Sequence, residues 1–524
     1  RFLQFNSGLL VNWKKQLNKK WKLSATLGHD YYQSRMNVEE TEGDELQQPG
    51  VFILSNAFQL SLEEAVFQKK IAGVFADIHL DYHNRLFLNF SGRNDWSSTL
   101  PQHNNSFFYP GIHIGLDMTP WLKRIPKLVY SKFRISYSTT GNDASTYLTD
   151  TYFSAASIDG DDLLPDLNFP AFGITAFERS TTLGNDNLRP ERAHNFEIGS
   201  ELKWWDSRLN LNLTWYKAIV RGQIINAELS AASGYLLSPI NAGTIENQGW
   251  EINLSGKWIH AKDWSWQSSI NFTQFRSLVT ALTPGIPSIM LGSYSSLSSM
   301  IIEGQPYGVF VGTSIKRNTE GERVIDEAGF PLLNDQHTII GDPNPDWLMS
   351  IQNILRYKGF ALNMQWDIRK GGDIWNGTKG VLSYLGVSKE SGEQREADAV
   401  VFEGVTESGE PNTKAVSLAD PSAGMSGIYW RRYGFLGLAE DHIEDASWLR
   451  LRELSFSYRF TLPWKQAQPP ECLVALQGHN LLLFTPYSGI DPETNLRGDS
   501  NIIGWDYFNM PGVKGCSLKL HIDF

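Results

Sequence analysis

Few residue groups in this chain have the types and spacing that catalysis needs. Ser426 and Ser488 lie close to glycines in AGMSGI and TPYSGI. Neither serine stands in a G-x-S-x-G sequence, and no strand–turn–helix pattern surrounds them. The sequence also lacks a phosphate-binding G-x-x-x-x-G-K-[ST] loop and zinc-type CxxC or HExxH spacings. We therefore predict that the protein is not an enzyme and that it carries no cofactor.

Carboxylate groups offer weak candidates for a metal or a proton relay. Asp77, His79 and Asp81 share one strand face, but alternate side chains lie about 6.5–7 Å apart, which is wide for one metal, so a solvated polar face is preferred. Calcium needs six to eight oxygen ligands. The weak calcium candidate is Asp159, Asp161, Asp162 and Asp166. A still weaker one is Glu39, Glu40, Glu42, Asp44 and Glu45.

Two polar segments combine aromatic rings with amide and carboxylate groups, a mixture that suits sugars or extended peptides. One segment begins at Thr140 and the other at Gly371. The candidate binding residues are Asn142, Asp143, Tyr147, Trp375, Asn376 and Tyr384. Three interpretations stay open for them: contact with a substrate, contact with a partner protein, and packing within the loops.

Composition narrows the class of protein that presents these residues. The 524 residues include 57 Asp and Glu against 46 Lys and Arg, which gives a net charge of −11. Nucleic-acid binding would require a basic face, so it is not predicted. No run of 18 apolar residues occurs, which excludes helical membrane spans. Aromatic residues make up 12% of the chain. A transmembrane β-barrel fits these features, because its strands carry only alternating hydrophobicity.

The dominant sequence pattern is two-residue alternation in paired segments. In AHNFEIGSELKWW the apolar Phe196, Ile198, Leu202 and Trp204 share one face, and after the turn DSR the segment LNLNLTWY alternates in the same way. This pattern predicts a β-hairpin with one apolar and one polar face. Similar pairs recur along the chain, which predicts about fifteen antiparallel strands.

The connections between these strands alternate between short and long. The long ones are expected at 34–69, 140–191, 276–344, 370–446 and 483–513. Tryptophans gather near the short connections, at Trp13, Trp21, Trp121, Trp204, Trp205, Trp258, Trp264 and Trp464. Short turns at one rim, long loops at the other and aromatic belts are typical of outer-membrane barrels. We therefore expect short periplasmic turns, long extracellular loops and contact with outer-membrane lipid.

The carboxyl-terminal strand strengthens this interpretation. In GCSLKLHIDF, one face carries Leu518, Leu520, Ile522 and Phe524. Such a strand with a terminal aromatic residue resembles the assembly signal of bacterial outer-membrane barrels. The alternative is the edge strand of a soluble sandwich. Single-chain bacterial barrels have even strand numbers. About fifteen strands therefore predict the C-terminal part of a larger barrel, completed by upstream residues or by a partner chain.

Several sequence blocks resemble the SusC/RagA family of TonB-dependent outer-membrane transporters of Bacteroidota. They occur in family order and include GRNDWSSTLPQHNNSFFYPGIHIGLDM, NDNLRPERAHNFEIG, ASWLRLRELSFSYRF, LQGHNLLLFTPYSGIDPE and YFNMPGVKGCSLKLHIDF. The resemblance implies a 22-stranded barrel with an N-terminal plug and a TonB box. It also implies a SusD-like surface lipoprotein, energy from TonB, ExbB and ExbD, and oligosaccharide or peptide substrates. Dimers of transporter–lipoprotein pairs are common in the family.

By this resemblance, residues 1–524 are all barrel, and the signal peptide, TonB box, plug and about seven strands are not among them. Three functions are therefore weighed. The first is nutrient import across the outer membrane together with a SusD-like lipoprotein. The second is a structural role as a barrel subunit of a larger outer-membrane assembly. The third, a soluble β-rich binding or carbohydrate-active protein, fits the membrane pattern least well.

Overall fold

The computed structural model describes residues 1–158, 167–395, 397, 399–418, 429–430, 433–435, 437–463 and 470–523. Within these residues the protein is built from strands and a few short helices, including α1 (Gly377–Tyr384) and α2 (Lys389–Gln394). None of the helices in the described ranges combines the length and apolar character needed to cross a membrane.

The main element is one fifteen-stranded sheet whose strands pair in chain order. This number confirms the prediction of about fifteen antiparallel strands. The strands are β1 (Phe2–Gln16), β2 (Trp21–Leu46), β3 (Ala57–Tyr82), β4 (Leu86–Ser97), β5 (Ser106–Asp117), β6 (Leu128–Asn142), β11 (Glu191–Trp204), β12 (Leu209–Arg221), β15 (Thr244–His260), β16 (Trp264–Ala281), β22 (Trp347–Tyr357), β23 (Phe360–Lys370), β27 (Trp448–Thr461), β28 (Glu471–Phe484) and β30 (Gly515–Asp523).

The long connections contain further short strands. Those between β6 and β15 are β7 (Phe153–Ala155), β8 (Ser157–Ile158), β9 (Leu167–Asn168), β10 (Phe177–Arg179), β13 (Ile224–Glu228) and β14 (Leu237–Asn241). Those after β16 are β17 (Ser288–Tyr294), β18 (Leu297–Ile302), β19 (Val309–Gly312), β20 (Val324–Ile325), β21 (Thr338–Gly341), β24 (Asp373–Asn376), β25 (Val405–Thr406), β26 (Ile443–Asp445) and β29 (Trp505–Asp506).

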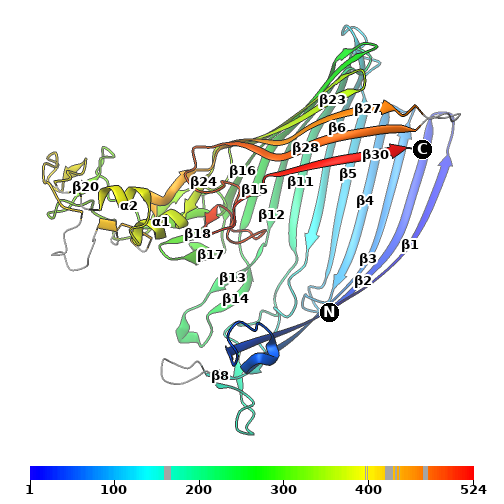
Figure 1. The fold of residues 1–524 in the computed structure, drawn as a ribbon. Helices are drawn as coiled ribbons and strands as arrows, with labels where there is room; N and C mark the ends of the chain where they lie inside the picture. The colour runs from blue at the N-terminus through cyan, green and yellow to red at the C-terminus, as the bar shows by residue number, and fades with distance from the viewer. Residues whose placement is uncertain are drawn as a thin grey trace. The chain divides into compact units, whose positions relative to one another are not determined.

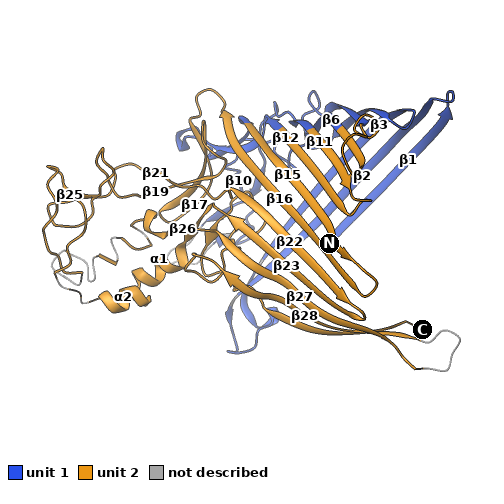
Figure 2. Ribbon diagram, turned by 90° about the horizontal axis from the view of Figure 1, so that it is seen from above, with its two compact units in different colours: residues 1–117, 134–197, 218–244 blue, residues 118–133, 198–217, 245–524 orange. Residues whose placement is uncertain are grey.

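The chain divides into two compact units. Unit 1 comprises Arg1–Asp117, Arg134–Glu197 and Ala218–Thr244, and unit 2 comprises Met118–Phe133, Ile198–Lys217 and Ile245–Phe524. In unit 1, β1 to β5 lie side by side as a series of hairpins (Figure 1). In unit 2, the same is true of β16, β22, β23, β27 and β28 (Figure 2). Each unit is described by itself below.

The two faces of the sheet differ in polarity, as the alternation predicts. Phe456 of β27 lies opposite Leu476 of β28, which lies opposite Leu518 of β30, and all three side chains are exposed. One residue along β28, Gln477 lies between the polar Ser455 and Ser517. Exposed leucine and phenylalanine side chains aligned across strands require an apolar solvent, so this face is suited to lipid.

The prediction of a long loop at 34–69 is wrong. Strands β2 and β3 stay paired from Trp21 and Tyr82 to Leu46 and Ala57, so only the segment 47–56 connects them. The misleading part of the sequence is its row of acidic residues, which places like charges opposite each other in the register. Such pairs are unfavourable, and they make an extended, hydrogen-bonded hairpin look like a polar loop.

Aromatic residues cluster where strands meet the short turns. Ring centroids lie 4.7 Å apart for Trp21 and Tyr82 and 4.4 Å apart for Trp264 and Tyr357. These pairs join neighbouring strands at the ends where the turns are short. Aromatic belts of this kind mark the membrane–water interface. Trp464, which the sequence places in the same belt, lies outside the described residues.

The final strand pairs with β28 as expected. Leu518, Leu520 and Ile522 lie on one face of β30, and Phe524 lies outside the described residues. The register places Cys472 opposite Ile522 and Cys516 opposite Gly478, and both cysteines are free thiols. The two thiols therefore lie at opposite ends of adjacent strands.

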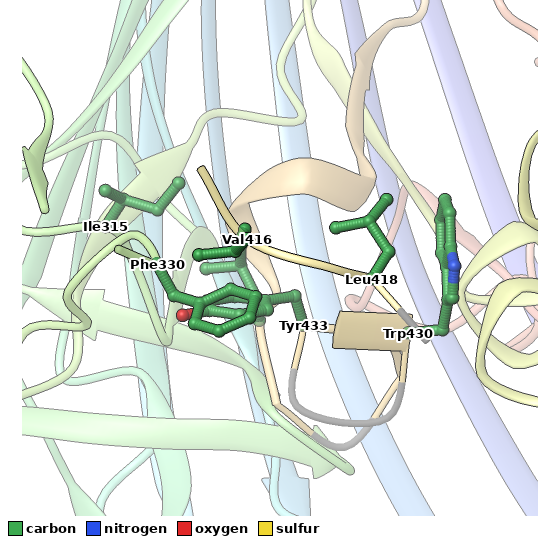
Figure 3. Close-up of a cluster of buried hydrophobic side chains, with 7 residues drawn as sticks. Ile315, Phe330, Val416, Leu418, Trp430 and Tyr433 are labelled. Atoms are coloured by element: carbon green, nitrogen blue, oxygen red, sulfur yellow. The ribbon is translucent and has the colours of Figure 1, made fainter. Parts of the chain in front are cut away.

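The long connections of unit 2 form their own apolar cores. One core gathers side chains from the connection after β19 and from the connection before β26, namely Ile315, Phe330, Val416, Leu418, Trp430, Tyr433 and Leu438. Figure 3 shows Phe330 beside Tyr433, and their ring centroids lie 6.4 Å apart. Two expected loops, 276–344 and 370–446, are thus packed together as a small folded region.

Candidate functional site

Two arginines of β27 hold a late connection against the polar face of unit 2. Arg450 Nη2 lies 2.6 Å from Asp491 Oδ1, and Arg450 Nε lies 2.8 Å from Glu493 Oε2. Arg452 Nη2 lies 2.8 Å from Glu493 Oε1, and its Nε donates to Asp367 Oδ2 of β23 at 2.8 Å. The network therefore joins two barrel strands to the segment GIDPETN, which follows β28.

A β-bulge allows both arginines to reach the same network. The pairing of β23 with β27 passes from Trp366 opposite Leu451 to Gln365 opposite Glu453, which leaves Arg452 as the extra residue. On the β28 side of β27, Arg452 Nη1 donates to Asn480 Oδ1 at 3.2 Å, and Asn480 has a φ of 53°. Bulges redirect side chains in this way at barrel rims and near functional sites.

Amide and hydroxyl groups extend the polar face beyond the arginines. Asp367 Oδ1 accepts hydrogen bonds from Ser350 Oγ at 2.8 Å and from Gln365 Nε2 at 3.2 Å. Asn363 Nδ2 donates to Glu453 Oε1 at 3.1 Å. Such a surface can exchange hydrogen bonds with hydroxyl or peptide groups of a passing polymer. The side chains named here are not arranged as a catalytic nucleophile with its general base.

Trp375 and Asn376 lie inside the loop core of unit 2. Strand β24 pairs with β29, and Trp375 meets Trp505 edge to face with ring centroids 6.2 Å apart. Both tryptophans and Asn376 are buried. Asn376 Oδ1 accepts a hydrogen bond from Lys379 N and caps α1. This burial favours loop packing over direct contact with a substrate for Trp375 and Asn376, whereas Tyr384, at the end of α1, is half-buried.

Glu444 connects the loop core to the segment that contains Ser488. Its carboxylate accepts hydrogen bonds from Ser488 N and Ser488 Oγ, both at 2.7 Å, and from Lys379 Nζ at 3.3 Å. Burial raises the pKa of Glu444, but the Ser488 hydrogen bonds and the charge of Lys379 outweigh it, so the pKa lies below its usual range. Ser488 therefore binds a structural carboxylate.

His442 gives the loop region of unit 2 a predicted dependence on pH. Burial, with the nearby charge of Lys379, lowers the pKa of His442 to about 4. In the unfolded chain the imidazole of His442 binds a proton near pH 6.5, whereas in the folded chain it stays neutral until the pH is much lower. The contribution of neutral His442 to the free energy of unfolding is therefore fully present above pH 6.5 and is lost as the pH falls toward 4. Between pH 7 and 5.5 we expect a loss of about 1 kcal/mol. Urea unfolding followed by tryptophan fluorescence measures it.

The matched comparison for this prediction is His442→Gln. The variant cannot bind the proton, so its unfolding midpoint should change less between pH 7 and 5.5 than that of the natural chain. Equal pH dependence in the two proteins would show that other groups cause it.

The three candidates of unit 1 have different surroundings. Asp143 pairs with Lys69 Nζ at 2.6 Å and accepts hydrogen bonds from Ser97 Oγ at 2.5 Å and Thr99 Oγ1 at 3.1 Å. Tyr147 is exposed, although its hydroxyl donates to the Val66 carbonyl at 3.0 Å. The structure thus ties Asp143 to neighbouring strands.

Asn142 is exposed at the end of β6, where its amide donates to Glu191 Oε2 at 3.1 Å. Asn142 and Tyr147 therefore keep surface available to a ligand or partner, unlike the more enclosed Asp143. These residues belong to unit 1, and the other three candidates belong to unit 2.

The carboxylates predicted as weak metal or proton-relay candidates either bind separate partners or lie outside the described residues. Asp77 Oδ2 accepts from Asn89 Nδ2 at 2.8 Å, and Asp81 Oδ1 accepts from the Asn84 amide at 2.7 Å. Across the described ranges, no three His, Cys, Asp or Glu side chains gather in a way that could hold a metal ion. The calcium candidates Asp159, Asp161, Asp162 and Asp166 lie outside the described residues.

Sequence reasoning did not single out Arg450, Arg452, Asp491 or Glu493. A signal was available in two of the blocks that carry the family resemblance. ASWLRLRELSFSYRF contains Arg450 and Arg452, and LQGHNLLLFTPYSGIDPE contains Asp491 and Glu493, which have the opposite charge. Alternation alone places Arg450 and Arg452 on one face, and the bulge between them and Glu453 can be seen only in the register.

A large antiparallel sheet with an exposed apolar face, a polar face and aromatic belts defines an outer-membrane β-barrel protein. The comparisons agree with this class. The chain belongs to the TonB dependent receptor-like β-barrel family, whose model matches residues 3–461. This family is one of receptors, which agrees with the prediction that the chain is not an enzyme.

Curated relatives and solved structures extend the match. TonB-dependent receptor P3 of Formosa agariphila is 27% identical over 490 residues, covering 87% of this chain and 46% of the relative. TonB-dependent receptor SusC of Bacteroides thetaiotaomicron is 22% identical over 462 residues, covering 82% of this chain and 42% of the relative. The structure of the RagAB peptide transporter has a TM-score of 0.78 at 19% identity, covering 100% of this chain and 56% of that chain.

The resemblance to SusC and RagA predicted from the sequence blocks is therefore confirmed. The chain spans about half the length of the curated relatives it matches.

Proposed function

We propose that these residues form the barrel of a SusC-like TonB-dependent importer that brings oligosaccharides or peptides across the outer membrane. The family match over residues 3–461 is the observation that carries the proposal. The polar face of β22, β23 and β27 supports it, because its amides and paired charges offer hydrogen bonds to the hydroxyl or peptide groups of such a polymer.

The partners follow from the same family. A SusD-like surface lipoprotein would cover the extracellular mouth, and TonB, ExbB and ExbD would supply energy through a plug and a TonB box outside these 524 residues. Exposed Asn142 and Tyr147, with half-buried Tyr384, are the proposed loop contacts for substrate or lipoprotein. Dimers of transporter–lipoprotein pairs belong to the same proposal.

Purification tests the partner. The full-length receptor, tagged and extracted from outer membranes in mild detergent, should bring down a surface lipoprotein, and crosslinking in cells should capture TonB. Recovery of other envelope machinery without a lipoprotein would favour the structural-subunit alternative. Recovery from cells without any detergent would favour a soluble protein and contradict the membrane assignment.

Growth tests the transport. Deleting the receptor gene, the lipoprotein gene or tonB should each abolish growth on the polymer whose fragments co-purify with the receptor, and growth on free monomers should continue. Mass spectrometry of the co-purified material distinguishes peptides from oligosaccharides. Unchanged growth of all three deletion strains on that polymer would rule out import by this receptor.

A further inference from the structure

A cluster of basic side chains lies at one end of the unit 1 strands, next to the long connections. Arg189, Arg192 and Arg221 are exposed there, and His103 and half-buried His194 lie beside them. We call these five residues the rim cluster. With Asn104, Ser106, Pro190, Gly222 and Asn241 they line a cavity of about 610 Å³.

The backbone of the rim cluster is held in place before any ligand binds. Asn241 Oδ1 accepts a hydrogen bond from Arg189 N at 2.9 Å, and Asn241 Nδ2 donates to the carbonyls of Arg189 and Gly222, both at 2.8 Å. Gly222 follows Arg221 and has a φ of 67°, which favours glycine. One asparagine thus fixes the chain at two of the three arginines.

Among the described residues, the arginines of the rim cluster have no acidic partner. In the described part of the chain, no carboxylate lies within salt-bridge distance of the three guanidinium groups, and none lines the cavity. Glu191 is adjacent in sequence, but its oxygens accept from Ile224 N at 2.7 Å and Asn142 Nδ2 at 3.1 Å. Three unpaired arginines in one cavity favour an anion.

Two members of the rim cluster, Arg192 and His194, lie on the apolar face of the sheet. In β11, Arg192, His194 and the exposed Phe196 alternate on one face. His194 Nδ1 lies 2.9 Å from the hydroxyl of exposed Tyr137 in β6. A second cavity, of about 290 Å³, is lined by the same Arg192 and His194 together with apolar and aromatic groups, namely Phe107, Phe108, Tyr109, Pro110 and Tyr137.

Cations therefore lie at the end of an apolar surface that is suited to lipid. Long connections mark the extracellular rim of outer-membrane barrels, so this position corresponds to the outer leaflet. We propose that the rim cluster binds the phosphate of a phosphorylated glycolipid headgroup of the outer leaflet. Arg189, Arg192 and Arg221 contact the phosphate through their planar donor groups, and acyl carbons lie against Phe108 and Pro110.

The double variant Arg192→Gln, Arg221→Gln tests the proposal in the full-length receptor. Its matched control is Arg208→Gln, Lys257→Gln, which removes the same charge at a short turn of unit 2, where Lys257 N donates to the Arg208 carbonyl at 2.7 Å. Each protein is placed in nanodiscs that contain phosphorylated lipid A or its dephosphorylated form. Native mass spectrometry counts bound lipid, and the midpoint of heat-induced barrel unfolding is measured in parallel.

We expect the unsubstituted receptor and the control to retain phosphorylated lipid A and to gain a higher unfolding midpoint from it. The rim variant should bind it at least about tenfold more weakly. The variant Arg192→Lys, Arg221→Lys should keep part of the binding, which separates lost charge from misfolding. Equal retention by all variants, equal binding of the dephosphorylated lipid, or the same stabilisation by inorganic phosphate alone would each overturn the proposal.

Discussion

Replacing Arg450 by methionine is expected to release the connection after β28 and to destabilise unit 2 by about 3–5 kcal/mol. The side chain of Arg450 is 5% exposed and that of its partner Asp491 is 11% exposed, at 2.6 Å. Methionine fills a similar volume but leaves the Asp491 carboxylate buried without its cation. The hydrogen bond that Asp491 Oδ1 accepts from Glu493 N at 3.0 Å offsets only part of this desolvation. Urea unfolding of the receptor in detergent measures the loss, and limited proteolysis near Asp491 shows where it occurs.

The same strand supplies the control for this prediction. Arg459 of β27 pairs with Glu471 at 3.0 Å, but the two side chains are 57% and 52% exposed. Exposed ion pairs contribute about 0–1 kcal/mol, so Arg459→Met should change stability little. The double variant Arg450→Met, Asp491→Asn should recover part of the loss because no buried charge remains. Equal effects of Arg450→Met and Arg459→Met would show that the network does not anchor the connection.

Strands that carry strict alternation can be predicted from the sequence. The segment with Phe196, Ile198, Leu202 and Trp204 lies within β11, and LNLNLTWY lies within β12, as expected. The wrong prediction of a long loop at 34–69 has a physical cause. Glu39 lies opposite Glu64 there, and local preference predicts a loop because like charges repel across a ladder. The backbone pairing between β2 and β3 nevertheless continues through this part.

The candidate site was harder to predict, because its placement depends on contacts between distant segments. Trp375 and Asn376 have the composition of a sugar-binding surface, yet the pairing of β24 with β29 buries them beside Trp505. That pairing joins residues 130 positions apart, as Trp375 opposite Trp505 shows, and no local pattern records it. The network of Arg450 with Asp491 has the same origin.

The substitution Leu476→Arg is expected to impair assembly of the barrel. Leu476 lies in the middle of β28, between Phe456 and Leu518, on the face with exposed apolar side chains. An arginine on the lipid face costs about 2–4 kcal/mol at mid-membrane and less near the interface. The folded fraction of protein in outer membranes, read from the mobility difference between heated and unheated samples, should fall.

The next residue of β28 provides a control with the same new side chain. Gln477 faces the opposite way, between Ser455 and Ser517, so Gln477→Arg adds its charge to a polar, hydrated face. Charge, size and strand position are then nearly equal in the two variants, and only the solvent that receives the guanidinium differs. Leu476→Arg should reduce assembly while Gln477→Arg leaves it close to normal. If both variants assemble alike, or if Gln477→Arg is the worse of the two, the assignment of the faces to lipid and water is wrong.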